Sequence, residues 1–228
     1  MIRILYEDNH LLGVEKPVNM PVCEDKSRDS DLLNACREYI RETYQKPGNV
    51  YLGLVHRLDR PVGGAMVFAK TSKAASRLSD LIRKNELHKT YLAVLDGIPE
   101  KQSDILVDYL VKDHESNMVR VTDEAHGKRS ELCYDVLAEK AGKTLVKIRL
   151  KTGRSHQIRV QFSSRKLPLM YDQRYHPNPG KGQIALWAYE LKFIHPVKKE
   201  PVVIRSLPPD TDPWNLFKEA YDNCQYEE

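Results

Sequence analysis

The sequence has few cysteines and no long apolar run. Its four cysteines are far apart and form no Cys-x-x-Cys pair, which argues against a zinc ribbon and a dithiol redox site. We expect unpaired thiols in a reducing compartment. No stretch approaches the roughly 18 consecutive apolar residues that a membrane span needs, and residues 1–8 have no signal-peptide core. These absences predict a cytoplasmic protein without a membrane partner.

Metal and nucleotide motifs are also missing. The eight histidines are scattered without metal-ligand spacing. Gly142-Lys143-Thr144 resembles the end of a phosphate-binding loop, but Leu137 occupies the place of its first glycine. A loose dinucleotide fingerprint at 180–185 follows Asn178-Pro179, where a strand is required. The sequence therefore predicts no metal and no cofactor.

The composition is that of an ordinary globular protein. Hydrophobic residues make up 41% and charged residues 30% of the 228 residues. A net charge of +4 permits a polyanionic partner without requiring one. We find no linker and predict a single domain over residues 1–228, with a polar, frayed tail from about residue 221.

The hydrophobic pattern predicts more strand than helix. Val146, Ile148 and Leu150 alternate with cations, which is the period of a half-buried strand. Strands are expected over 2–7, 11–15, 65–69, 184–194, 201–206 and most of 88–150. Helices are expected over 30–45 (capped by Ser30 or Asp31 and ended by Pro47-Gly48), behind an N-cap at Ser72, over 155–165 and near 213–222. This pattern predicts an α+β fold: a mixed, mainly antiparallel sheet core with flanking helices and a central cleft.

Three segments carry candidate chemistry. In His56-Arg57-Leu58-Asp59-Arg60-Pro61-Val62-Gly63-Gly64, two arginines flank a carboxylate and favour its ionised, nucleophilic form. Lys89-Thr90-Tyr91 offers a ring for stacking on a base and a hydroxyl for proton transfer. Residues 151–159 combine three cations with Ser155, His156 and Gln157. Taken singly, each is better explained structurally, as a charged turn, a core aromatic and an exposed basic loop.

Together, and in this order, the segments resemble the RluA-type pseudouridine synthase family over roughly residues 2–206. His56-Arg57-Leu58-Asp59 matches the family's catalytic motif letter for letter. Lys16-Pro17, Lys89 to Val94, Gly153 to Val160 and a segment reaching Asp172 and Tyr175 resemble its other motifs. Two segments depart from the family: Val62-Gly63-Gly64 replaces Thr-Ser-Gly, and Tyr171 replaces the glycine before Asp172.

The resemblance implies an RNA uridine isomerase without metal or cofactor. Asp59 would be the nucleophile, and Arg57 would enter the RNA stack as the uridine flips out. Tyr91 would stack on the uracil and assist proton removal from C5, and Arg159 would pair with Asp59. The same motifs suggest a set of RNA contacts, which comprises Arg57, His56, Arg60, Lys89, Arg154, His156 and Gln157. The expected partner is a tRNA or an rRNA, bound by a monomer that takes part in tRNA or rRNA processing.

Two other functions are compatible with parts of the pattern. A synthase-like fold that grips RNA without turnover would keep the basic residues and lack the reactive group, but the expected reactive group is present. A glycosidase-like hydrolase acting on nucleosides would need two placed carboxylates. Only Asp59 stands out, with Asp172 as a distant second. Isomerisation is therefore the preferred hypothesis.

Overall fold

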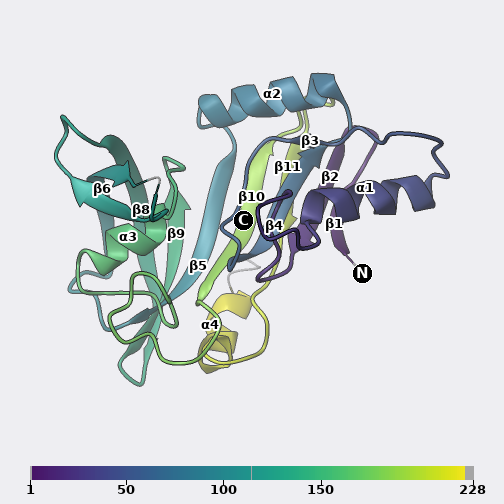
Figure 1. Cartoon of the computed structure of the whole chain (residues 1–228). Coiled ribbons are helices and arrows are strands. Elements are labelled where there is room, and N and C mark those ends of the chain that lie inside the picture. The colour runs from purple at the N-terminus through teal and green to yellow at the C-terminus, as the bar shows by residue number, and fades with distance from the viewer. Residues whose placement is uncertain (1, 114, 224–228) are drawn as a thin grey trace. The chain divides into compact units, whose positions relative to one another are not determined.

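The computed structural model describes residues 2–113 and 115–223. The chain divides into two compact units (Figure 1). Unit 1 comprises Met1–Lys89 and Ala188–Leu207, and unit 2 comprises Thr90–Trp187 and Pro208–Glu228. The single domain and the central cleft remain predictions, whereas the mixed and mainly antiparallel strand arrangement is confirmed in both units.

Unit 1 is built on strands in the order β1-β2-β4-β10, with β11 paired to β10 and β3 paired to β4. The pairs β1–β2, β2–β4, β3–β4 and β10–β11 are antiparallel. Every strand that we expected here is present. The bounds are β1 Arg3–Glu7, β2 Leu11–Lys16, β3 Gly53–Leu54, β4 Gly63–Ala69, β10 Leu186–Ile194 and β11 Pro201–Arg205. Lys16 pairs with Gly64 in the β2–β4 register, so the end of β2 lies beside the start of β4.

Helix α2, Ser72–Arg83, covers one face of these strands. Its Ala74 and Leu78 pack with Leu11 and Val67, because alternate strand residues point to the same face. The expected cap at Ser72 is wrong by one residue: the Thr71 hydroxyl accepts the Ala74 N–H at 3.2 Å. Either hydroxyl suits a cap, and Thr71 holds the extended backbone that an N-cap needs.

Helix α1, Leu32–Thr43, begins at one of the two expected caps. The Asp31 carboxylate accepts the Asn34 N–H at 2.9 Å. The helix ends at Thr43, with Tyr44 as its C-cap, earlier than the expected stop at Pro47-Gly48. Its Tyr39 and the capping Tyr44 both donate their hydroxyls to Glu7 of β1 at 2.8 Å, so side-chain bonds to β1 fix this end.

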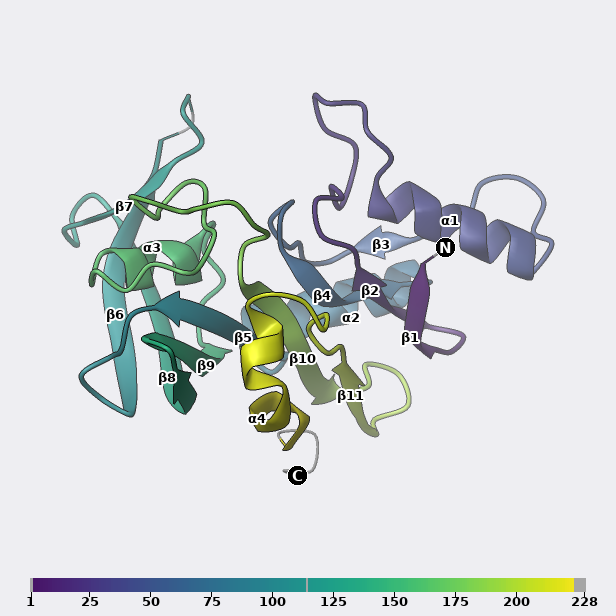
Figure 2. The same cartoon turned by 90° about the horizontal axis from the view of Figure 1, so that it is seen from below.

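Unit 2 contains the strand order β5-β9-β8-β6-β7, as expected for the strand-rich stretch 88–150. The bounds are β5 His88–Asp96, β6 Ser103–Lys112, β7 Val119–Thr122, β8 Lys128–Lys140 and β9 Lys143–Leu150. Helix α3, Gln157–Ser163, lies beside these strands in both views (Figure 2). Val160 of α3 packs with Leu110 and Val119, and Phe162 meets Tyr134 edge-on.

The chain ends in a short 3-10 helix η1, Trp214–Phe217, followed by α4, Lys218–Asn223. This confirms the helix expected near 213–222. The expected frayed tail begins too early, because Tyr221 lies within α4 and is only 1% exposed. The rest of that tail, 224–228, lies outside the described residues. Among the described residues, no helix is long and apolar enough to cross a membrane.

Candidate active site

The loop that carries Asp59 connects β3 to β4 in unit 1. The Val62 N–H donates to the Asp59 carbonyl at 2.9 Å and closes a turn over Arg60-Pro61. Gly64 has φ +119, and a Cβ there would lie 2.3 Å from the Ala188 carbonyl oxygen. No other residue can therefore occupy position 64 without moving β10. The second glycine of Val62-Gly63-Gly64 thus fixes where β4 leaves the Asp59 turn.

Lys16 ties this turn to the end of β2. Its side chain is fully buried, and its ammonium donates to the carbonyls of Pro17 and Arg60, each at 2.9 Å. Burial lowers the pKa of Lys16 to about 7, while the negative charge of Asp59 opposes the shift and Arg60 adds to it. Sequence reasoning assigned Lys16 no role, and its only signal was the Lys16-Pro17 pair in the resemblance.

His56 is buried against β4, and its expected contact with RNA stays a prediction. The ring is 8% exposed, and its Nε2 accepts the Val67 N–H of β4 at 3.1 Å. Burial, with a smaller contribution from Lys89, lowers the pKa of His56 to about 3. The ring is therefore neutral at physiological pH and helps to hold the Asp59 loop against β4.

The buried His56 predicts a loss of stability in mild acid. Below pH 6.5 the unfolded chain protonates this ring while the folded chain does not, so the free energy of unfolding falls as the pH falls towards 3. A His56→Gln variant keeps an acceptor and removes the titration. Between pH 6.5 and 5, we expect the wild type to lose up to about 1.4 kcal/mol per pH unit more than this variant. Urea denaturation measures the free energy of unfolding at each pH. An equal fall for the two proteins between pH 6.5 and 5 would refute this origin of acid sensitivity.

Three cations expected to bind RNA also belong to unit 1. Arg57 is exposed, as a side chain that enters an RNA stack must be. Arg60 is exposed but is held by the Asn19 carbonyl, the Ser27 hydroxyl and the carboxylate of Asp29. Lys89 is half-buried, and burial lowers its pKa. Of the three, Arg57 has the freest access to a polyanion.

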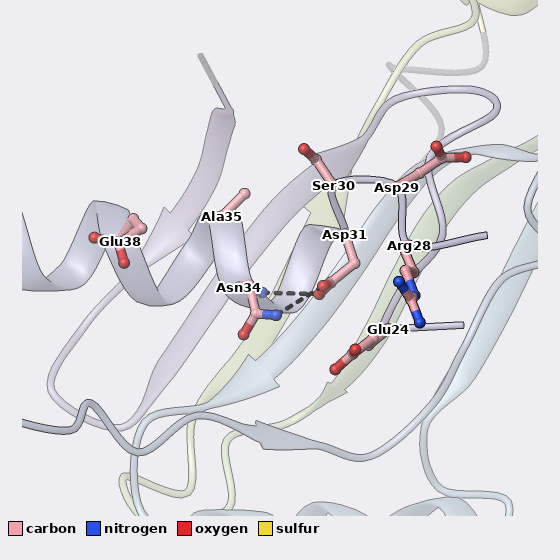
Figure 3. A pocket seen from close by; sticks show the side chains of 8 residues that line it. All are labelled: Glu24, Arg28, Asp29, Ser30, Asp31, Asn34, Ala35 and Glu38. Atoms are coloured by element: carbon pink, nitrogen blue, oxygen red, sulfur yellow. Dashed lines mark hydrogen bonds between the residues drawn. The ribbon is translucent and has the colours of Figure 1, made fainter. Parts of the chain in front are cut away.

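An open pocket of about 540 Å³ lies at the start of α1 (Figure 3). It is lined by Glu24, Arg28, Asp29, Ser30, Asp31, Asn34, Ala35 and Glu38. Four carboxylates against one arginine make this surface repulsive to phosphate. Asp31 is occupied in capping α1 through Asn34. The pocket is therefore unsuited to RNA and lies outside the candidate site.

In unit 2, Arg159 of α3 forms a buried bidentate pair with Asp172. The Nε and Nη2 donors lie 2.9 and 2.6 Å from the two carboxylate oxygens. Burial alone would raise the pKa of Asp172, but the hydrogen bonds and charge of Arg159, with the N–H groups of Arg174 and Tyr175, lower it. Asp172 is thus an ionised anchor for Arg159. Sequence analysis did not predict this ion pair, although it placed Asp172 and Tyr175 in one segment of the family resemblance.

Tyr171, the departure from the family's glycine, adopts the left-handed conformation that favours glycine, with φ +60. Its ring rests on Gly182, where a Cβ would lie 2.5 Å from the ring atoms. Its hydroxyl donates to the carboxylate of Asp212. These contacts hold the residue before Asp172 in a backbone conformation that tyrosine rarely adopts.

The remaining predicted residues of unit 2 have unequal exposure. Tyr91 lies in β5 and is buried, whereas Arg154 is exposed and donates to the Arg129 carbonyl. His156 is half-buried and lies 2.7 Å from the Tyr175 hydroxyl. Its pairing with RNA remains a prediction, as do the catalytic role of Tyr91 and the expected pair of Arg159 with Asp59.

The side chain of Gln157 bonds within its own unit, and its expected contact with RNA stays a prediction. Its side-chain oxygen accepts the Arg154 N–H at 3.0 Å and the Thr152 hydroxyl at 2.9 Å. Its amide nitrogen donates to the Glu131 carbonyl and to Gln161. The side chain is buried, and these bonds use both ends of the amide. Gln157 therefore shapes the loop before α3, and the exposed Arg154 is better placed to meet RNA.

Among the described residues, no group of three or more His, Cys, Asp or Glu side chains could hold a metal ion.

Several known proteins are similar to this chain in sequence. A family model described as RNA pseudouridylate synthase matches residues 10–164. Ribosomal large subunit pseudouridine synthase C of Buchnera aphidicola subsp. Acyrthosiphon pisum is 31% identical over 220 residues, covering 92% of this chain and 68% of that protein. Ribosomal large subunit pseudouridine synthase D of Yersinia pestis is 33% identical over 211 residues, covering 86% and 63%. The chain thus spans about two thirds of the length of these curated relatives.

Solved structures agree on the fold. The human protein RNA Pseudouridylate Synthase Domain Containing 4 superposes with a TM-score of 0.79 at 19% identity, covering 99% of this chain and 94% of that one. The human protein RNA Pseudouridylate Synthase Domain Containing 1 superposes with a TM-score of 0.73 at 20% identity, covering 92% of this chain and 85% of that one. Structures this distant in sequence support the fold, and the family assignment rests on the sequence match. The chain belongs to the RNA pseudouridylate synthase family, the isomerases of uridine in RNA.

Proposed function

We propose that this protein converts specific uridines of large-subunit ribosomal RNA to pseudouridine, with Asp59 as nucleophile. The observation that carries the proposal is the Asp59 turn, which the buried Lys16 and the constrained Gly64 hold in one geometry. Such a fixed carboxylate is what nucleophilic catalysis requires. The choice of ribosomal RNA is supported by two relatives that are named for the ribosomal large subunit.

The chemistry explains the composition of the site. Isomerisation breaks the bond between uracil N1 and ribose C1′, rotates the base, and joins C5 to C1′. The proton on C5 must then leave while N1 takes up a proton, so that the product is an isomer, and we assign the removal at C5 to Tyr91. A stacked base cannot be reached, so the uridine must flip out at a cost of a few kcal/mol. The exposed Arg57 would fill the gap in the RNA and offset part of this cost.

The environment of Asp172 argues against a nucleoside hydrolase. That reaction class uses two carboxylates with separate roles. Asp172, the second candidate, is fully buried and accepts hydrogen bonds from Arg159, Arg174 and Tyr175. A carboxylate whose lone pairs are already engaged is not available as an acid or base. In this proposal Asp172 holds the Arg159 guanidinium in place, and Arg159 pairs with Asp59.

Tritium release from RNA labelled at uracil C5 tests the proposed reaction. RNA should come from a strain that lacks the gene, because its target uridines are unmodified. We expect label to enter water in proportion to pseudouridine formed in large-subunit ribosomal RNA. No release would indicate a binding protein, and free uracil with abasic sites would indicate a hydrolase. Release from purified tRNA alone would keep the reaction and overturn the ribosomal target.

A further inference from the structure

The guanidinium of Arg159 is held on an edge and on a face. Asp172 takes the edge formed by Nε and Nη2. The ring of Tyr175 lies against the guanidinium, with 5.1 Å between the Arg159 Cζ and the ring centroid. This distance is within the range of a cation–π contact, in which the electron-rich ring face attracts the cation. The edge contact fixes the guanidinium plane, and the face contact limits its tilt.

Tyr175 is itself fixed at several points. Its hydroxyl accepts the Val119 N–H at 2.9 Å and lies 2.7 Å from the Nδ1 of His156. Its backbone N–H donates to Asp172 at 3.2 Å, and its carbonyl accepts the Ser163 hydroxyl at 2.6 Å. The ring therefore has little freedom to move away from Arg159. The ring is therefore a fixed surface beside the long, flexible side chain of Arg159.

We propose that Tyr175 is a positioning residue, whose ring face orients the Arg159 guanidinium for its partnership with Asp59. This inference rests on the proposed function. The ring acts through its electron density, and the hydroxyl acts only to hold the ring. Tyr175 does not need to touch RNA in this role, so its loss should lower kcat and leave the KM for RNA nearly unchanged.

A graded series at position 175 tests the electronic part of the proposal. Tyr175→Phe keeps the ring and is expected to retain kcat within about twofold, since the cation–π contact survives. Tyr175→Met keeps the apolar bulk without the ring, and should lower kcat about tenfold, the rate equivalent of one buried cation–π contact. Fluorinated phenylalanines at 175 keep the shape and withdraw density from the ring face. Their kcat should fall with each added fluorine.

Steady-state measurements supply kcat and KM, and single-turnover measurements with enzyme in excess over RNA supply the rate constant of the chemical step. Thermal melts show which variants are folded. Tyr134→Met is the matched control, because Tyr134 lies in the same unit and packs on Phe162. We expect it to keep kcat. A flat fluorine series, or equal kcat for the Phe and Met variants, would overturn the role of Tyr175 while the wild type stays active. An inactive wild type would instead refute the proposed function.

Discussion

Replacing Asp59 with alanine is expected to abolish pseudouridine formation and to leave RNA binding intact. The proposed reaction needs a carboxylate, and removal of a nucleophile typically costs on the order of 10⁴-fold or more in rate. Asp59 is part of a surface turn and is only half-buried, so the fold should tolerate the change. Tritium release would measure the rate, and filter binding would measure the affinity for RNA.

A surface carboxylate of the same unit provides the control for Asp59. Asp80 of α2 pairs with Arg83 at an exposed position, and Asp80→Asn should keep full activity. Asp59→Asn tests whether the volume of the side chain is enough for activity, since this variant preserves the volume and removes the charge. Residual turnover in a clean Asp59→Ala preparation would contradict the assignment of Asp59 as nucleophile. Loss of RNA binding would contradict the separation of binding from chemistry.

Lys16→Met is expected to lower activity about 100-fold, because displacing a reactive group by about 1 Å costs that much. Met fills the buried space but leaves the carbonyls of Pro17 and Arg60 without this donor. The free energy of unfolding should fall by about 1–3 kcal/mol, the cost of a desolvated acceptor. Lys70→Met is the matched control. Lys70 is also largely buried and pairs with Glu7, so its loss should lower stability and spare kcat.

Lys16 also gives stability a pH dependence of known sign. Between pH 7 and pH 9, the unfolded chain keeps a proton on this lysine that the folded chain has lost, because the folded pKa is about 7. The free energy of unfolding therefore rises with pH in this window, by up to about 1.4 kcal/mol per unit. Lys16→Met should lack this part of the slope. Equal slopes for the two proteins, measured by urea denaturation, would contradict a buried lysine of low pKa.

Local patterns predicted most of the elements. Alternation predicted β9, in which Val146 and Ile148 are buried. The cap of α1 at Asp31 was within reach of sequence, because an acidic side chain preceded a helical pattern. The cap of α2 was missed by one residue, as Thr71 and Ser72 have equal chemistry. The end of α1 was missed because Tyr39 and Tyr44 bond to Glu7, more than 30 residues away.

The site was predictable only where its residues are neighbours in sequence. Asp59 and Arg57 share one motif, which is a property of a single segment. Lys16 meets the Arg60 carbonyl across 44 residues, and no local pattern indicates that contact. His56 and Gln157 were expected at RNA because they belong to the motifs of the resemblance, and no local pattern indicates that both side chains are buried. A sequence motif identifies candidate residues, and packing in the folded chain decides which of their side chains can reach a ligand.

The left-handed Tyr171 has an evolutionary consequence. A side chain larger than glycine at this φ costs roughly 1–2 kcal/mol, and the contacts with Gly182 and Asp212 must offset that cost. Because the ring occupies the space of a Cβ at position 182, a side chain at 182 requires a smaller residue at 171. We therefore expect positions 171 and 182 to vary together among homologues. Chains with glycine at 171 would be free to carry a side chain at 182, and those with tyrosine would not.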